Sequence, residues 1–314
     1  MEDFLFANSV AKTKENSLMT SERLSRLISC ADLDSASKIL IENGYGGISG
    51  AGLTDAFSLL KAEEEQLSKF CDGVKLRGTV FDCFLLLTDW HNIKVLLKAE
   101  ALNTSADEYL LTGGLTDIKE LKETVKTSAV FREVFDKYKK GNSPRLIDTL
   151  CDKLCFAEIE KRLSGAQTDK SVKKYFAALS DTKNIASFVR SADIQAEKDF
   201  FGEHFVPGGL LAEDFFTAIY PDCVLLSQRL NMTEYTKLAN LILSDQAAFS
   251  TETDNYINDI FKASRSDMFS LAPAIGYYVG KKAELSTVKT VLICKKAGVA
   301  DYEITKRLRK LYTE

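Results

Sequence analysis

The stretch Asp89-Trp-His-Asn92-Ile-Lys-Val-Leu-Leu-Lys98 decides the fold class, because it returns 92 residues later as Asp181-Thr-Lys-Asn184-Ile-Ala-Ser-Phe-Val-Arg190. Each copy begins with Asp, has Asn three residues later, and carries apolar residues at the fourth, seventh and eighth positions after the Asp. Apolar residues at this spacing form one face of an α-helix. The repeat therefore predicts two equivalent amphipathic helices.

A weaker third copy begins at Glu284, 103 residues after Asp181, with Thr287 where the other copies have Asn. Asp and Asn are poor helix formers, because their short polar side chains compete for nearby backbone groups and favour caps and turns. The Asp-x-x-Asn pair therefore predicts a structural role. It is either a helix cap or a polar pair bonded to a neighbouring helix.

Glycine pairs follow both strong copies. Gly113-Gly114 comes 24 residues after Asp89, and Gly208-Gly209 comes 27 residues after Asp181. Glycine can close one helix in the left-handed conformation, and a following Thr or Asp can accept the free amides of the next helix. Because the order of motifs is the same twice, the repeated unit is larger than one helix. We expect three helical units, at residues 1–110, 111–205 and 206–314.

The rest of the chain agrees with an all-α fold. Only 4 prolines and 17 glycines interrupt 314 residues, and strict apolar alternation is hard to find. Hydrophobic residues make up 45% and charged residues 27%, which is typical of a globular protein and argues against disorder. The net charge of −4, with mixed signs throughout, argues against nucleic acid as a partner.

Two further features indicate a cytoplasmic location. No segment reaches the roughly 20 apolar residues that a membrane-spanning helix needs, and the first residues carry acids rather than the basic start of a signal peptide. The seven scattered cysteines indicate reduced, buried thiols. Cys151 and Cys155 lie on one helical face, but nothing in the sequence completes a zinc site around them.

The sequence predicts no catalytic residue, no cofactor and no metal. Gly276-Tyr-Tyr-Val-Gly280-Lys-Lys is one residue too short for a phosphate-binding loop, so its glycines are interpreted as close helix packing. The run Glu63-Glu64-Glu65 is interpreted as a solvated face. His91 has Lys183 at the matching position of the second copy, so it is interpreted as a partly exposed helical histidine. Trp90 is expected to be a core residue or an anchor between helices, and Glu284 with Lys289 is a candidate polar pair.

At these residues the chain resembles the C subunit family of V-type and archaeal-type rotary ATPases, whose eukaryotic members are called the d subunit. The resemblance includes both strong copies of the repeat and extends over most of the chain. Its departures are Thr287, where a polar residue such as Asn is expected, and Lys289, which replaces an Arg. The other segments that carry it are Val206-Pro-Gly-Gly-Leu210, Tyr277-Tyr278, Lys282-Ala-Glu284 and Ile304-Thr-Lys-Arg-Leu-Arg-Lys-Leu-Tyr312.

This resemblance implies a funnel-shaped protein of three similar helical bundles around a pseudo-threefold axis. It also implies a non-catalytic role, in which the chain joins the central shaft to the membrane proteolipid ring and sits peripherally on the membrane. Two other hypotheses stay open: a helical-repeat adaptor and a helical metal-dependent enzyme. The observed offsets of 92 and 103 residues exceed the roughly 33–47 residues of common solenoid repeats. The sequence assigns no residue to a partner contact, and it leaves the choice between protons and sodium open.

Overall fold

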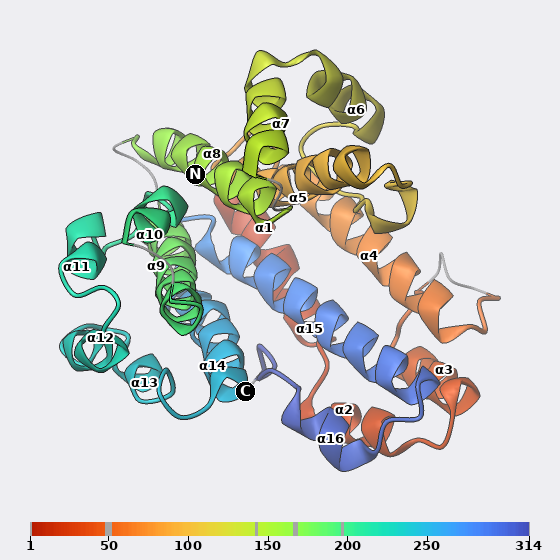
Figure 1. Cartoon of the computed structure of the whole chain (residues 1–314). Coiled ribbons are helices and arrows are strands. Elements are labelled where there is room, and N and C mark those ends of the chain that lie inside the picture. The colour runs from red at the N-terminus through yellow and green to blue at the C-terminus, as the bar shows by residue number, and fades with distance from the viewer. Residues whose placement is uncertain (1, 48–51, 142–143, 166–168, 196–197, 314) are drawn as a thin grey trace. The chain divides into compact units, whose positions relative to one another are not determined.

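A computed structural model describes the chain except residues 1, 48–51, 142–143, 166–168, 196–197 and 314. The described residues form helices and no strand, which confirms the all-α prediction (Figure 1). The helices are α1 Glu2–Glu15, α2 Ser21–Ser29, α3 Leu33–Glu42, α4 Ala56–Gly73, α5 Asp82–Leu102, η1 Asp107–Tyr109, α6 Ile118–Thr127, α7 Ala129–Gly141, α8 Pro144–Leu163, α9 Lys170–Asp193, α10 Lys198–His204, α11 Glu213–Thr217, α12 Cys223–Leu230, α13 Thr236–Ala239, α14 Gln246–Asp259, η2 Ile260–Ser264, α15 Ala272–Lys296 and α16 Asp301–Lys306.

The helices group into two compact units. We call Met1–Arg77 together with Asp245–Glu314 the terminal unit, and Gly78–Ser244 the central unit. The terminal unit therefore combines both ends of the chain. The division into three units at 1–110, 111–205 and 206–314, and their threefold arrangement, stay predictions.

In the central unit, α5 packs against α8 and α6, and α8 also packs against α7. Trp90 on α5 is buried and meets Phe131 on α7 edge to face, with ring centroids 5.8 Å apart, so the expected interhelix anchor is confirmed. A second aromatic cluster joins α9 to α10 and α11 through Phe188, Phe201 and Phe216. Buried aromatic rings contribute a large share of such a core, because each buries much apolar surface.

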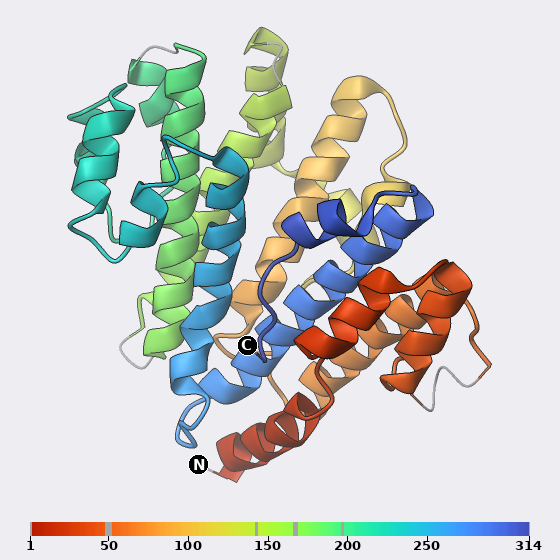
Figure 2. The same cartoon turned by 90° about the horizontal axis from the view of Figure 1, so that it is seen from below.

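In the terminal unit, α15 is the central helix, and α1, α2, α3 and α4 pack against it (Figure 2). Pro273 lies in its first turn, as expected of a residue with no amide to donate. A Cβ atom at Gly280 would overlap the ring of Tyr312, and one at Gly276 would lie 2.7 Å from the Tyr312 hydroxyl oxygen. The two glycines therefore permit close packing of the C-terminal segment on α15.

Candidate functional site: three buried acids and the loops they bind

The first copy of the repeat holds a loop with two buried side chains of α5. Asn92 donates from Nδ2 to the Leu111 carbonyl and accepts from the Leu111 amide, both at 2.8 Å. Asp89 accepts the Leu115 amide at Oδ1 and the Thr116 amide at Oδ2, both at 3.0 Å. Together the pair satisfies four backbone groups of the loop between η1 and α6.

The second copy repeats these contacts on α9. Asn184 exchanges two hydrogen bonds of 2.8 Å with the backbone of Val206. Asp181 accepts the Leu210 amide at 2.9 Å and the Leu211 amide at 3.0 Å. The Tyr235 hydroxyl also donates to Asp181 Oδ2 at 2.7 Å.

The Asp-x-x-Asn pair is therefore neither a helix cap nor a link between two helices. Asp89 and Asp181 lie in the interior of long helices and are both buried. Their partners are the backbone groups of an irregular loop, which is partly buried in the first copy and more deeply buried at Val206 and Leu211 in the second. The two copies thus share one geometry, which we call the acid clamp: a buried carboxylate on a long helix that accepts backbone amides of a loop.

The glycine pairs fit the same geometry. Gly113 and Gly208 have φ of +82° and +89°, a left-handed backbone that suits glycine. A Cβ atom at Gly114 would overlap Asp89 Oδ1, and one at Gly209 would overlap Asp181 Oδ1. The second glycine of each pair is thus required because the carboxylate approaches its Cα closely.

Burial changes the acidity of both carboxyls. Loss of water raises the pKa of Asp181 above its usual value, although the Tyr235 hydroxyl and the two loop amides act in the opposite direction. Burial likewise raises the pKa of Asp89, against the lowering effect of Thr116 and Leu115. Burial is thus the main cause of both raised pKa values, and the bonds from the loops only reduce its effect.

Substituting Gly209 with alanine is expected to destabilise the central unit by about 2 kcal/mol or more, because the Asp181 carboxylate must move away from its two amides. Urea unfolding of the full chain, read by hydrogen exchange in α9, measures this loss. Gly202→Ala is the matched control, since its Cβ would lie 3.2 Å from the flexible end of Glu213. Equal stability of the two variants would contradict the acid clamp.

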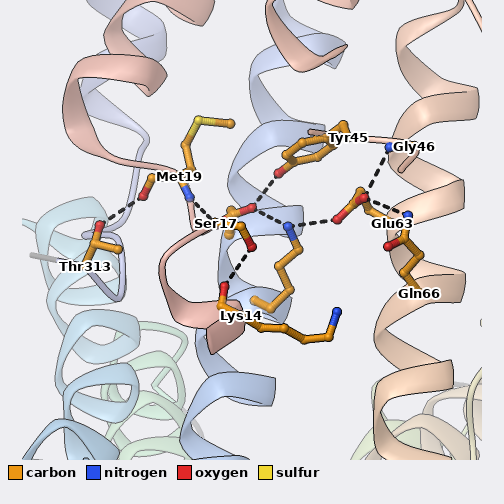
Figure 3. Close-up of polar contacts among 10 residues, drawn as sticks. Lys14, Ser17, Met19, Tyr45, Gly46, Glu63, Gln66 and Thr313 are labelled. Carbon is orange, nitrogen blue, oxygen red and sulfur yellow. Dashed lines mark hydrogen bonds and ion pairs between the residues drawn. The ribbon is translucent and has the colours of Figure 1, made fainter. Parts of the chain in front are cut away.

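Glu284, the third acid, lies buried on α15 in the terminal unit. Its Oε2 accepts the Met19 amide at 2.6 Å, and its Oε1 accepts the Tyr45 hydroxyl at 2.7 Å. Figure 3 labels Met19, Tyr45 and Glu63 in this cluster. Lys281 donates to Oε1 at 2.7 Å. The expected pairing of Glu284 with Lys289 is wrong: Lys289 is exposed, and the cation that reaches Glu284 is one helical turn on its other side.

Glu63 is a member of this cluster that the sequence interpretation missed. It is buried, forms an ion pair of 3.0 Å with Lys281 and accepts the Gly46 amide at 3.2 Å, so the solvated-face interpretation is wrong for it. Glu64 and Glu65 are exposed, as expected. The signal was its spacing: Glu63 lies on the apolar stripe of α4 with Leu59, Leu60, Leu67 and Phe70.

The described residues include no group of three His, Cys, Asp or Glu side chains placed to hold a metal ion. Cys151 and Cys155 are buried, and burial raises the pKa of the Cys151 thiol to about 12. The His91 ring contacts the Tyr109 carbonyl at 3.2 Å through Nε2. In the part of the chain that the structure describes, no helix is both long and apolar enough to cross a membrane.

Comparison with known proteins gives two findings. A family model described as the ATP synthase (C/AC39) subunit matches residues 7–307. The C subunit of the V-type sodium ATPase of Enterococcus hirae is 19% identical to this chain, over 97% of this chain and 98% of the relative. The matched range includes all three buried acids and both glycine pairs.

Proposed function

This chain belongs to the ATP synthase (C/AC39) subunit family, and on that premise we propose that it couples the rotating shaft of a V-type ATPase to the proteolipid ring in the membrane. The family is a non-catalytic stalk subunit of V-type ATPases. In the proposed role the chain transmits torque during ATP-linked transport of protons or sodium ions. It would lie on the cytoplasmic face of the membrane, held there by the proteolipid ring.

The observation that carries the proposal is the extent of the match, which covers residues 7–307 of 314. A match to a local motif would support only a shared site. A match of this extent supports the same role for the whole chain. The relative of similar length is a subunit of a sodium ATPase. Sodium is accordingly one of the two ions that this chain's complex would move.

The acid clamps suit a part that bears torque. A loop held only by its two ends deforms easily, because its backbone bonds to water exchange freely. Here the loops at Leu111–Thr116 and Val206–Leu211 are each bonded to the middle of a long helix by buried side chains. Rigid packing of this kind lets one face of a protein transmit force to another.

The segment Ile304–Thr313 offers a surface for an acidic partner. It carries Lys306, Arg307, Arg309 and Lys310 and contains no acid. Arg307 and Lys310 are exposed and form no ion pair with any residue that the structure describes. Arg309 bonds Asp254 at 2.8 Å, which fixes the segment to α14. Exposed cations held in place favour association with an acidic surface.

Pull-down of the tagged full chain from membranes of its own cells in mild detergent tests the proposal. We expect shaft subunits and proteolipids to copurify with it. A chain that binds neither would contradict the proposed function. The double variant R307E/K310E is expected to recover at least about fivefold less of the shaft subunits, because like charges would then face an acidic partner.

The matched control for that variant is K61E/K69E, which changes the same charge on exposed positions of α4 in the same unit. If R307E/K310E recovers as much of the shaft subunits as the native chain, the basic segment is not part of the interface. The proposed function would still stand. Loss of the variant's binding to vesicles of anionic lipid, with normal recovery of ATPase subunits, would assign the segment to the membrane surface instead.

A further inference from the structure

The three acid clamps share one register relative to the helix that follows the loop. Asp89 accepts the Thr116 amide, Asp181 the Leu211 amide and Glu284 the Met19 amide. In each case the next short helix begins two residues later, as α6 at Ile118, α11 at Glu213 and α2 at Ser21. In each case a buried apolar side chain lies five residues after the amide: Leu121, Phe216 and Leu24.

The second and third clamps agree further along the chain. Asp222 caps α12 and Asp32 caps α3, and thirteen residues after each cap stands a tyrosine, Tyr235 or Tyr45. Each tyrosine hydroxyl donates to the clamp acid at 2.7 Å. A buried serine lies five residues after each cap, and a buried leucine lies eight residues after it. These residues are Ser227 and Leu230 in one segment and Ser37 and Leu40 in the other.

One difference separates the third clamp from the others. For α5 and α9, the clamped loop and short helices follow the long helix in the chain. For α15, they come from residues 18–45, more than 200 residues earlier. Both segments nevertheless belong to one compact unit, which combines Met1–Arg77 with Asp245–Glu314.

We propose that residues 18–45 are the structural continuation of α15, so that the two ends of the chain together build the third repeated unit. The repeat is thus cyclically shifted along the sequence. Glu284 is the positioning residue that closes the third unit. It accepts the Met19 amide near the start of residues 18–45 and the Tyr45 hydroxyl at their end. This closure is independent of what the chain binds.

The shift accounts for the loss of Asn in the third copy. Asn92 and Asn184 bond the backbone of Leu111 and Val206, each five residues before the clamped amide of Thr116 or Leu211. Five residues before Met19 stands Lys14, which is in the last turn of α1. Helical backbone already forms its own hydrogen bonds. An Asn at position 287 would have no loop backbone to hold, and Thr287 stands there instead.

Hydrogen exchange of the full chain, resolved by peptide, tests the proposal. Glu284→Gln is expected to raise the exchange rate at Met19 and through α2 and α3 by about tenfold or more. The variant loses a buried, charged hydrogen-bond acceptor, so the segment opens more often. Asp181→Asn is expected to give the matching pattern over Leu211–Thr217, in the same register. Neither variant should change exchange at the other's loop.

If Glu284→Gln changes exchange rates only in α15 and near Glu63, and residues 19–45 keep their native rates, the proposal is overturned. Glu284 would then be only a member of a local ion pair. Tyr45→Phe provides a second measurement if Glu284→Gln fails to fold. It removes a single hydroxyl and is expected to raise exchange over Leu33–Tyr45 several-fold, as Tyr235→Phe should over Cys223–Tyr235. Native rates in both tyrosine variants would also overturn it.

Discussion

Replacing Lys281 with methionine is expected to destabilise the terminal unit by about 3 to 5 kcal/mol, the cost of leaving a buried charge without its partner. The Lys281 ammonium lies 2.7 Å from Glu284 Oε1 and 3.0 Å from Glu63 Oε2. Only 6% of the lysine side chain is exposed, so water cannot replace it. Without the cation, two carboxylates face each other in the core. Denaturant unfolding read by hydrogen exchange in α15 measures the loss.

Lys289→Met is the matched control, because it removes the same charge from an exposed position of the same helix. Its effect is expected to stay within about 0.5 kcal/mol. The double variant Lys281→Met/Glu63→Gln should recover part of the lost stability, since it removes one of the two stranded charges. A Lys281→Met variant as stable as the Lys289→Met control would show that the cluster is not electrostatically coupled.

Replacing Asp181 with alanine is expected to destabilise the central unit by about 3 kcal/mol or more, because it removes the acceptor of a buried amide, a partly buried amide and a buried hydroxyl. Those groups are the Leu210 and Leu211 amides and the Tyr235 hydroxyl. Asp181 itself is fully buried, so the vacated space is closed to bulk water. Thermal unfolding of the full chain, with exchange in Val206–Leu211 as the local reading, checks this loss.

Two comparisons make this prediction specific. Asp117 caps α6 at an exposed position, and Asp117→Ala should cost no more than about 1 kcal/mol. In the Asp181→Ala background, Gly209→Ala should cost much less than in the native chain, because the oxygen that its Cβ would overlap is gone. Additive costs of the two substitutions would show that Gly209 is required for another reason.

The sequence by itself determined the all-α class and the first two copies of the repeat. Helical periodicity depends on residues three and four apart, so it is visible in a local window. The shared Asp, Asn and glycine pairs marked α5 and α9 as equivalent, and the structure shows that they hold equivalent loops. Single residue types gave two further predictions: close packing at Gly276 and Gly280, which lack a Cβ atom, and an anchor at Trp90.

Only the tertiary structure decided what these residues bind. Asp89 reaches a loop 26 residues away, and Glu284 reaches an amide 265 residues away. No local pattern encodes a partner at that distance, because hydrogen bonds between remote segments depend on how the whole chain packs. Glu63 illustrates the same limit: as one of three consecutive acids it resembles a solvated face, and only the approach of Lys281 from α15 accounts for its burial.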